Sequence, residues 1–259
     1  MADDRPPSLP PTEPRVVVVT GAARGIGLGI ALAFAAQHDA VALVDIDPAV
    51  TKVAGELQDD GVEAHAWVGD VARREDVERC LDEVAGRFGR VDVLVNNAQA
   101  GGNPAPLIET TPEHLELAWR SGFVGTFTAM QIAFPHLRAT RGCVINMVSG
   151  AALSEPPGFS AYAATKSAIK TLTRIAATEW GPDGVRVNAI SPSARTPALD
   201  EWAGAHPTDY AARIAQIPLG RMGDARDDIG AVAVFLAGPS AAYITGQTIV
   251  VDGGVHHLG

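Results

Sequence analysis

Residues 16–34 read VVVVTGAARGIGLGIALAF. The first five residues predict a strand that is buried on both faces, and the Ala- and Leu-rich stretch after Gly27 predicts a helix. Between them, Gly21, Gly25 and Gly27 follow a G-x-x-x-G-x-G spacing. Such glycines permit a tight turn and let backbone N–H groups approach a pyrophosphate at a helix N-terminus. An ordinary tight connection is the alternative, but the position between a strand and a helix favours a nucleotide site.

Six more short apolar runs follow, separated by segments long enough for crossover helices. Strands that alternate with helices predict a parallel sheet. We therefore expect one Rossmann-like, doubly wound α/β domain over residues 15–259, with a seven-stranded, mainly parallel sheet and helices on both faces. The expected strands are Val16–Thr20, Val41–Asp45, His65–Val68, Val91–Val95, Cys143–Val148, Val185–Ile190 and Thr248–Val251.

Four other segments have distinctive patterns. Pro112–Arg138 has a cap residue before it and a proline in its first turn, which predicts a long helix. Ser160–Trp180 has apolar residues at helical spacing. Residues 1–14 contain five prolines and are expected to form a mobile tail. The pattern weakens over about 193–218, where we expect a lid-like substrate segment.

Composition excludes several classes of protein. Of the 259 residues, 47% are hydrophobic and 19% charged, which excludes a disordered chain. No apolar run approaches the roughly 18 residues of a membrane helix, and the start does not resemble a secretory signal. Two cysteines cannot build a disulfide framework, so we expect a cytoplasmic protein. A net charge of −10 argues against nucleic acid and anionic membranes as partners.

An acidic residue ends the second expected strand. Asp45 lies 24 residues after Gly21, near the ~20-residue offset of an acid that binds the adenosine ribose. Because a carboxylate there would repel a 2′-phosphate, NAD is favoured over NADP. The alternative is a helix cap, a role we assign to Asp47. Arg24 is a counter-signal, since a cation in this loop could meet a 2′-phosphate.

Three polar residues form a candidate catalytic set. Tyr162 and Lys166 stand four residues apart, so they share one face of the predicted helix, and Ser149 follows the fifth expected strand. Tyrosine is a poor base at its ordinary pKa near ~10, but a nearby ammonium favours the phenolate. On an exposed helix this spacing is usually a solvated pair. Here the pair follows a nucleotide loop and a strand that leads into Ser149, and this position favours a catalytic role.

The sequence resembles the short-chain dehydrogenase/reductase family over roughly residues 15 to 254. The resemblance rests on motifs in a fixed order: Thr20-Gly-Ala-Ala-Arg-Gly-Ile-Gly27, Asp70-Val71, Asn96-Asn97-Ala98, Ser149, Tyr162-x-x-x-Lys166, Asn188-x-x-Ser191-Pro192 and Thr245-Gly-Gln…Val251-Asp-Gly-Gly254.

The resemblance implies roles for these residues. Ser149 would orient the substrate oxygen and Tyr162 would be its acid/base. Lys166 would lower the tyrosine pKa and hold the nicotinamide ribose. Asn188 and Asp252-Gly253-Gly254 would be structural. The residues implied to bind the cofactor are Gly21, Arg24, Gly25, Ile26, Gly27, Asp45, Ile46, Asp70, Val71, Asn97, Ala98, Tyr162, Lys166 and Pro192.

Three departures from the family pattern stand out. Gln99 replaces the glycine of Asn-Asn-Ala-Gly, which would strain the turn if it requires a positive φ, unless the loop is rebuilt. Pro192 is followed by Ser193 rather than glycine, and Thr196 falls one residue early, which leaves their cofactor contacts open. Gly122 replaces an Asn that the family links to a helix irregularity and a proton-relaying water. We expect water to reach Lys166 through backbone carbonyls near Gly122.

Substrate-pocket candidates are Gln99, Leu153, Phe159, Arg195 and Trp202, with surface packing as the alternative. A partner such as Asp200 would equally explain Arg195. His256 and His257 predict a surface tail rather than a metal site, and no metal is expected. The two long helices resemble the pair by which family members dimerise, so we expect a homo-oligomer, a tetramer or dimer.

The sequence therefore predicts an NAD(H)-dependent oxidoreductase that interconverts a secondary alcohol and a ketone, with a small molecule as substrate. One alternative is an NADPH-dependent carbonyl or 3-oxoacyl reductase. A second, from another class, is a nucleotide-binding protein with little or no catalysis.

Overall fold

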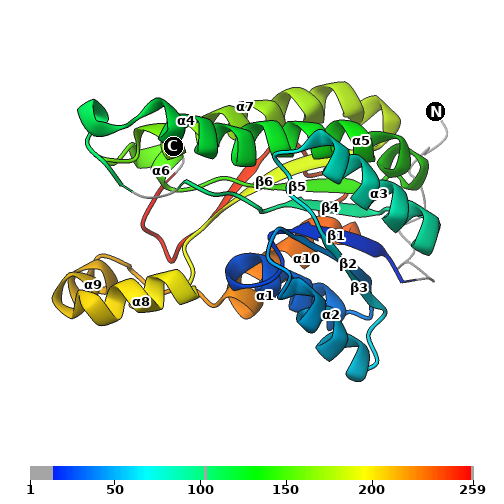
Figure 1. Cartoon of the computed structure of the whole chain (residues 1–259), viewed down its shortest axis with the longest axis horizontal. Coiled ribbons are helices and arrows are strands. Elements are labelled where there is room, and N and C mark those ends of the chain that lie inside the picture. Colours follow the sequence, from blue (N-terminus) through cyan, green and yellow to red (C-terminus); the bar gives the residue numbers. More distant parts are fainter. Residues whose placement is uncertain (1–13, 102–103, 258–259) are drawn as a thin grey trace.

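The protein forms one seven-stranded sheet in the spatial order β3-β2-β1-β4-β5-β6-β7. We describe it from a computed structural model, which covers residues 14–101 and 104–257 (Figure 1). Every pair of neighbouring strands is parallel. The strands are β1 (Val16–Thr20), β2 (Ala40–Asp45), β3 (Ala64–Val68), β4 (Val93–Asn96), β5 (Cys143–Met147), β6 (Arg186–Pro192) and β7 (Thr248–Val251). The predicted doubly wound fold is confirmed, with strand ends displaced by no more than two residues.

Helices cover both faces of the sheet (Figure 1). The α-helices are α1 (Gly25–Ala35), α2 (Val50–Asp59), α3 (Arg74–Phe88), α4 (Pro112–Ala118), α5 (Gly125–Thr140), α6 (Ala151–Ser154), α7 (Ser160–Trp180), α8 (Pro197–Ala205), α9 (Pro207–Ala215) and α10 (Ala231–Ala237). Short 3₁₀ turns are η1 (Leu107–Glu109), η3 (Gly181–Asp183) and η5 (Pro239–Ala241), and π-helical turns are η2 (Trp119–Val124) and η4 (Ala225–Gly230).

The core lies in two layers, one on each side of the sheet. Successive strand residues point to opposite faces, so Val17 and Val19 pack toward α1 and α10 whereas Val16 and Val18 pack toward α3 and α5. All four valines are buried. This two-sided burial explains why the strands read as continuous apolar runs rather than as alternating patterns.

The helix predicted over Pro112–Arg138 is wrong in one respect, because it is three elements rather than one. The chain passes from α4 through the π-helical turn η2 into α5, which runs on to Thr140. Ser121 Oγ donates to the carbonyl of Leu117 at 2.6 Å inside the irregular stretch. A π-turn inserts extra residues without interrupting the apolar stripe, so periodicity could not reveal it.

The weakly patterned segment 193–218 contains two short helices, α8 and α9. Figure 1 shows them beyond the edge of the sheet, and none of their residues is buried. Their weak pattern follows from this, because they pack on each other rather than on the core. The expected tail lies outside the described residues except for Pro14. Among the helices described, none is both long and apolar enough to cross a membrane.

Candidate active site

The glycine loop joins β1 to α1 at the centre of the sheet. The N–H of Gly21 donates to the carbonyl of Val44 at 2.7 Å, and Gly21 has a φ of 68°. A side chain at Gly27 would collide with the Gly21 carbonyl and the Asn97 amide. Only glycine fits this close approach, which leaves the N-terminus of α1 open to an anionic group.

Side chains from two strands fix the loop in place. Thr20 Oγ1 accepts the N–H groups of Asn97 at 3.0 Å and Ala98 at 3.1 Å. Asn97 Nδ2 in turn donates to the carbonyls of Thr20 at 3.0 Å and Gly21 at 3.1 Å. The Asn97 amide therefore holds the loop, and its nitrogen is already engaged by the protein.

Asp45 ends β2 beside this loop. Its Oδ2 accepts the N–H of Ala23 at 2.9 Å and its Oδ1 accepts that of Asp47 at 2.9 Å. Each carboxylate oxygen retains a second lone pair for a hydroxyl donor. Asp47 accepts the N–H of Ala49 at 3.0 Å in the turn before α2, whose N-cap is Ala49 and which has no side-chain cap, so the cap expected at Asp47 is not formed. The acid at the end of β2 thus suits a ribose diol.

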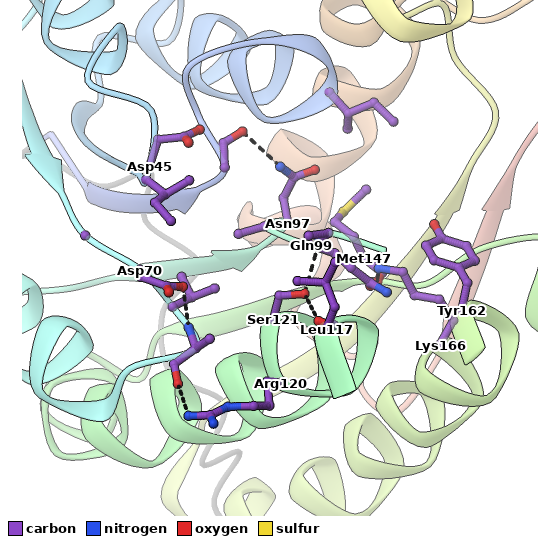
Figure 2. A pocket seen from close by; sticks show the side chains of 18 of the residues that line it. Asp45, Asp70, Asn97, Gln99, Leu117, Arg120, Ser121, Met147, Tyr162 and Lys166 are labelled. Carbon is purple, nitrogen blue, oxygen red and sulfur yellow. Dashed lines mark hydrogen bonds between the residues drawn. The ribbon is translucent and has the colours of Figure 1, made fainter. Parts of the chain in front are cut away.

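A cavity of about 800 Å³ runs from Asp45 along the carboxyl ends of the strands to Lys166 (Figure 2). Its size is in the range of small-molecule and cofactor sites. Of the predicted cofactor residues, those that line it are Gly21, Arg24, Ile26, Asp45, Ile46, Asp70, Val71, Asn97, Ala98, Tyr162, Lys166 and Pro192. Gly25 and Gly27 lie behind this wall in the glycine loop. The cradle, the acid and the elongated cavity fit a dinucleotide.

Tyr162 and Lys166 occupy the inner end of the cavity, where α7 crosses the ends of β5 and β6. Lys166 is buried, and its Nζ lies 5.6 Å from the centre of the Tyr162 ring. Nζ donates to the carbonyl of Met147 at 2.6 Å. The Ser149 side chain lies near enough to Tyr162 to lower the pKa of its phenol. The structure therefore brings the three predicted catalytic residues together.

Burial governs the protonation of this pair. It lowers the pKa of Lys166 to about 7, with no charged neighbour contributing. Burial also raises the pKa of Tyr162, and the hydrogen bond from Ser149 offsets part of that rise. In the protein alone, burial thus disfavours the charged forms of both groups. A charged Lys166, which acid/base chemistry at Tyr162 requires, needs further hydrogen-bond acceptors.

Gln99 is compatible with its turn. The described non-glycine residues with a positive φ are His38, Arg141 and Glu155, so Gln99 is not among them. The left-handed position falls instead at Gly101, with a φ of 79°. The turn therefore requires no positive φ at position 99, and the strain considered for Gln99 does not arise. Thr196 also lines the cavity despite its displaced position, and its methyl lies close to Gly25.

Four of the five substrate candidates are absent from the described lining of this cavity: Leu153, Phe159, Arg195 and Trp202. Arg195 instead pairs with Asp200 at 2.6 Å in solvent, and Trp202 stacks on His206. Arg195 lies just before α8 and Trp202 lies within it, in the segment 193–218. Gln99 does line it.

His256 differs from the expected surface tail, whereas His257 is exposed as expected. His256 Nδ1 lies 2.7 Å from Asp252 Oδ2 and its Nε2 lies 3.2 Å from Ser154 Oγ, so His256 fastens the chain end to α6. Asp252 also accepts three backbone N–H groups, a structural role. Within the described ranges, no group of three or more His, Cys, Asp or Glu side chains is arranged to hold a metal ion.

One wall of the cavity escaped prediction. It is formed by α4, η2 and the loop before α3, and its residues are Ala72, Arg73, Glu113, Glu116, Leu117, Arg120 and Ser121. The only signal in the sequence was the long predicted helix, which gave no reason to place one of its faces at the cofactor cavity.

Comparisons with known proteins agree with this geometry. The family model described as enoyl-(acyl carrier protein) reductase matches residues 21–256. The chain is 36% identical to 12α-hydroxysteroid dehydrogenase from Clostridium sp., covering 93% of this chain and 96% of that protein. It is 41% identical to L-fucose dehydrogenase from Oryctolagus cuniculus, covering 93% and 84%.

A solved structure shares the fold closely. It is 3-ketoacyl-(acyl-carrier-protein) reductase from Brucella melitensis complexed with NADH. The TM-score is 0.86 at 31% identity, and the match covers 94% of this chain and 98% of that one. The similarity therefore extends over the whole cavity.

The lowered pKa of Lys166 predicts a pH dependence of stability in the cofactor-free protein. The unfolded chain binds this proton below its ordinary pKa of 10.5, whereas the folded protein releases it above about 7. Because the unfolded state binds more protons in that window, the free energy of unfolding rises with pH from about 7 to about 10.5. The contribution is at most about 5 kcal/mol and is absent from Lys166→Met.

Urea unfolding at several pH values tests this expectation. The free energy of unfolding of wild type, relative to that of Lys166→Met, should rise steadily between pH values of about 7 and about 10. Lys52→Met, at an exposed lysine, should differ from wild type by a constant amount. A constant difference for Lys166→Met as well would contradict the lowered pKa.

Proposed function

The chain belongs to the short-chain dehydrogenase/reductase family, and on this premise we propose that it interconverts a secondary alcohol and a ketone with NAD(H), using Ser149, Tyr162 and Lys166. One observation carries the proposal. A buried lysine and a tyrosine whose pKa Ser149 lowers meet at the inner end of a cavity whose outer end carries Asp45. The nicotinamide, when bound, supplies or accepts the hydride.

The protein's own groups handle the proton. In the oxidation direction, Tyr162 takes the hydroxyl proton while the substrate C–H bond loses a hydride, and a ketone results. Ser149 orients the same oxygen by a hydrogen bond. Lys166 favours the phenolate electrostatically when it is charged, which counteracts the effect of burial on the pKa of Tyr162. In the reduction direction the same groups return the proton.

Two alternatives are kept for specific reasons. The solved relative with bound NADH is named a 3-ketoacyl reductase, and Arg24 lies in the cavity wall with Asp45. These points support an oxoacyl reductase or NADPH as the competing interpretation. The replaced family residues Gln99 and Gly122 support a nucleotide-binding protein with little catalysis. The assembled Ser149, Tyr162 and Lys166 argue for an enzyme.

Replacement of Tyr162 tests the catalytic proposal. Tyr162→Phe removes the hydroxyl that transfers the proton, so kcat should fall by about 10²–10⁴-fold while NADH binding persists. The measurement is nicotinamide absorbance with a 12α-hydroxysteroid, L-fucose and simple secondary alcohols, and with the matching ketones and NADH.

A matched control exists at Tyr243, which is fully exposed. Tyr243→Phe should leave turnover unchanged. Full turnover by Tyr162→Phe would refute its role, and NADH binding without turnover by the wild type would favour the binding-protein alternative.

Replacement of Asp45 tests the cofactor proposal. The carboxylate repels a 2′-phosphate, so NADH should bind at least about tenfold more tightly than NADPH, a difference of about 1.4 kcal/mol. Asp45→Ala should reduce this preference, as measured by fluorescence titration with both cofactors. Asp47→Ala, at the acid of the following turn, should preserve it. Equal affinities in the wild type would disprove the role of Asp45.

The face formed by α5 and α7 supports the proposal of a homo-oligomer. These helices run side by side (Figure 1) and leave an apolar groove of about 770 Å³. Phe127 and Ile175 are 39% and 50% exposed there. We infer that a second copy covers this groove, as a dimer or as part of a tetramer.

Sedimentation of wild type and Phe127→Glu tests the assembly. An unpaired carboxylate in the buried interface should dissociate a dimer into monomers, or a tetramer into dimers. Val68→Glu, on the edge strand β3 away from the groove, should sediment like wild type. A monomeric wild type would exclude this interface.

Two further proposals concern the chain as a whole. Residues 15–259 would act as one unit, with α8 and α9 as a mobile lid over the substrate end of the cavity. Their lack of buried residues supports such movement. The free, buried thiols of Cys80 and Cys143 support a cytoplasmic location.

A further inference from the structure

Gln99 lies in the loop that follows β4 and faces the π-helical turn. The loop is tied to that turn, because the N–H of Ala100 donates to Ser121 Oγ at 3.0 Å. Ser121 Oγ donates onward to the carbonyl of Leu117 at 2.6 Å. Figure 2 shows Gln99 beside these residues at the inner part of the cavity. The tether directs the Gln99 side chain toward Gly122.

The Gln99 carboxamide occupies the space that a side chain at position 122 would need. A Cβ added to Gly122 would lie 2.9 Å from both Cδ and Oε1 of Gln99. It would also lie 2.6 Å from the methyl group of Thr165, the residue before Lys166. These distances are too short for real contacts. Glycine at 122 is therefore a condition for the amide to lie where it does.

Both polar atoms of this amide are shielded from solvent. Within the residues that the structure describes, neither Nε2 nor Oε1 of Gln99 has a hydrogen-bond partner. An unpaired buried polar group costs about 1–3 kcal/mol, and an apolar side chain would avoid that cost. Such a group in a cavity wall points to a partner that enters the cavity.

Lys166 is the group in this region that most needs acceptors. Its ammonium has three donors, of which the structure pairs one, with the carbonyl of Met147. Lys166 and Gln99 line the same cavity. The Gln99 amide lies beside Gly122, and so does Thr165, which directly precedes Lys166 in α7. Oε1 can accept a hydrogen bond and Nε2 can donate one, so one amide can orient a water on both sides.

We infer that Gln99 is a positioning residue whose carboxamide holds the water through which Lys166 exchanges its proton with solvent. This rests on the proposed function. In the oxidation direction, the proton that Tyr162 removes from the alcohol leaves by way of Lys166 and this water. The amide donates and accepts hydrogen bonds and is itself unchanged. The sequence led us to expect that backbone carbonyls near Gly122 hold this water. The Gln99 side chain, which reaches the same place, takes that role instead.

Gln99→Met is the first test, because methionine has a similar length and lacks the amide. Three readouts separate positioning from packing. The pKa of Lys166 should fall by about one unit, because the charged form loses an acceptor. The solvent deuterium isotope effect on kcat should rise, and kcat should fall by about tenfold or more. KM and the affinity for NADH should stay within about twofold of wild type. Gln37→Met, the same change at an exposed glutamine, is the control.

The pKa of Lys166 can be read directly by NMR with ¹³C-labelled lysine, without substrate. The chain has three lysines, Lys52, Lys166 and Lys170. Three signals are therefore expected, and Lys52→Arg and Lys170→Arg assign them. This measurement does not depend on turnover, so it separates failure of the inference from failure of the proposed function, which Tyr162→Phe tests.

A rescue variant moves the amide to the facing position. Gln99→Gly combined with Gly122→Asn places a carboxamide at position 122, and Thr165→Ser removes the methyl group in its way. This last change keeps the hydroxyl, which in Thr165 donates to the carbonyl of Ala161 at 2.9 Å. The triple variant should recover most of the kcat and the Lys166 pKa lost in Gln99→Met, whereas Gly122→Asn alone should impair both.

Two results would overturn the inference. One is a Gln99→Met protein with the wild-type Lys166 pKa and isotope effect, which would make Gln99 a packing residue. The other is a loss confined to KM, which would make Gln99 a substrate contact.

Discussion

A parallel sheet brings the carboxyl ends of all its strands to one edge, and the site depends on this constraint. At that edge the backbone leaves the ladder, and its polar groups need new partners. Between β1 and β4 the winding of the chain reverses, so the connections diverge and a crevice opens. Thr20 and Asn97 supply the missing hydrogen bonds across it. The crevice is thus held open by the same bonds that satisfy the strand ends.

A buried lysine at the end of this crevice creates an electrostatic conflict. Burial disfavours the ammonium of Lys166 and lowers its pKa, yet the same burial makes its charge more effective on Tyr162, because water screens it less. The conflict is resolved by hydrogen-bond acceptors around Nζ. The carbonyl of Met147 is one, and it comes from the last residue of β5. The remaining acceptors must enter through the cavity, so ligand binding and the charge of Lys166 are coupled.

Much of the fold and part of the site could be predicted from sequence, and the division has a physical basis. Strands buried on both faces leave continuous apolar runs, which made five of the seven strands readable in the sequence: β1, β2, β4, β5 and β6. Asp45 ends a strand, so its placement followed from that strand. Tyr162 and Lys166 stand four residues apart on one predicted helix, and the resemblance to the family implied their roles. The π-helical turn around Gly122 is short and lies between two helices, so the spacing of apolar residues did not reveal it. The direction in which Trp202 points depends on helices that pack outside the core, and no local pattern encodes it.

The relation between positions 99 and 122 lay beyond any local pattern. In the sequence, Gln99 stands where the family has glycine, and Gly122 stands where the family has Asn. Each replacement, taken alone, argued against a working site. In the fold, the absence of a side chain at Gly122 leaves room for the Gln99 carboxamide. An amide group therefore reaches this place from the loop after β4 instead of from the helix. Because any side chain at 122 would collide with Gln99 and Thr165, the two replacements are coupled sterically. The buried, unpaired amide of Gln99 indicates a chemical role, because an apolar residue would fill the same space without the free-energy cost of an unpaired polar group.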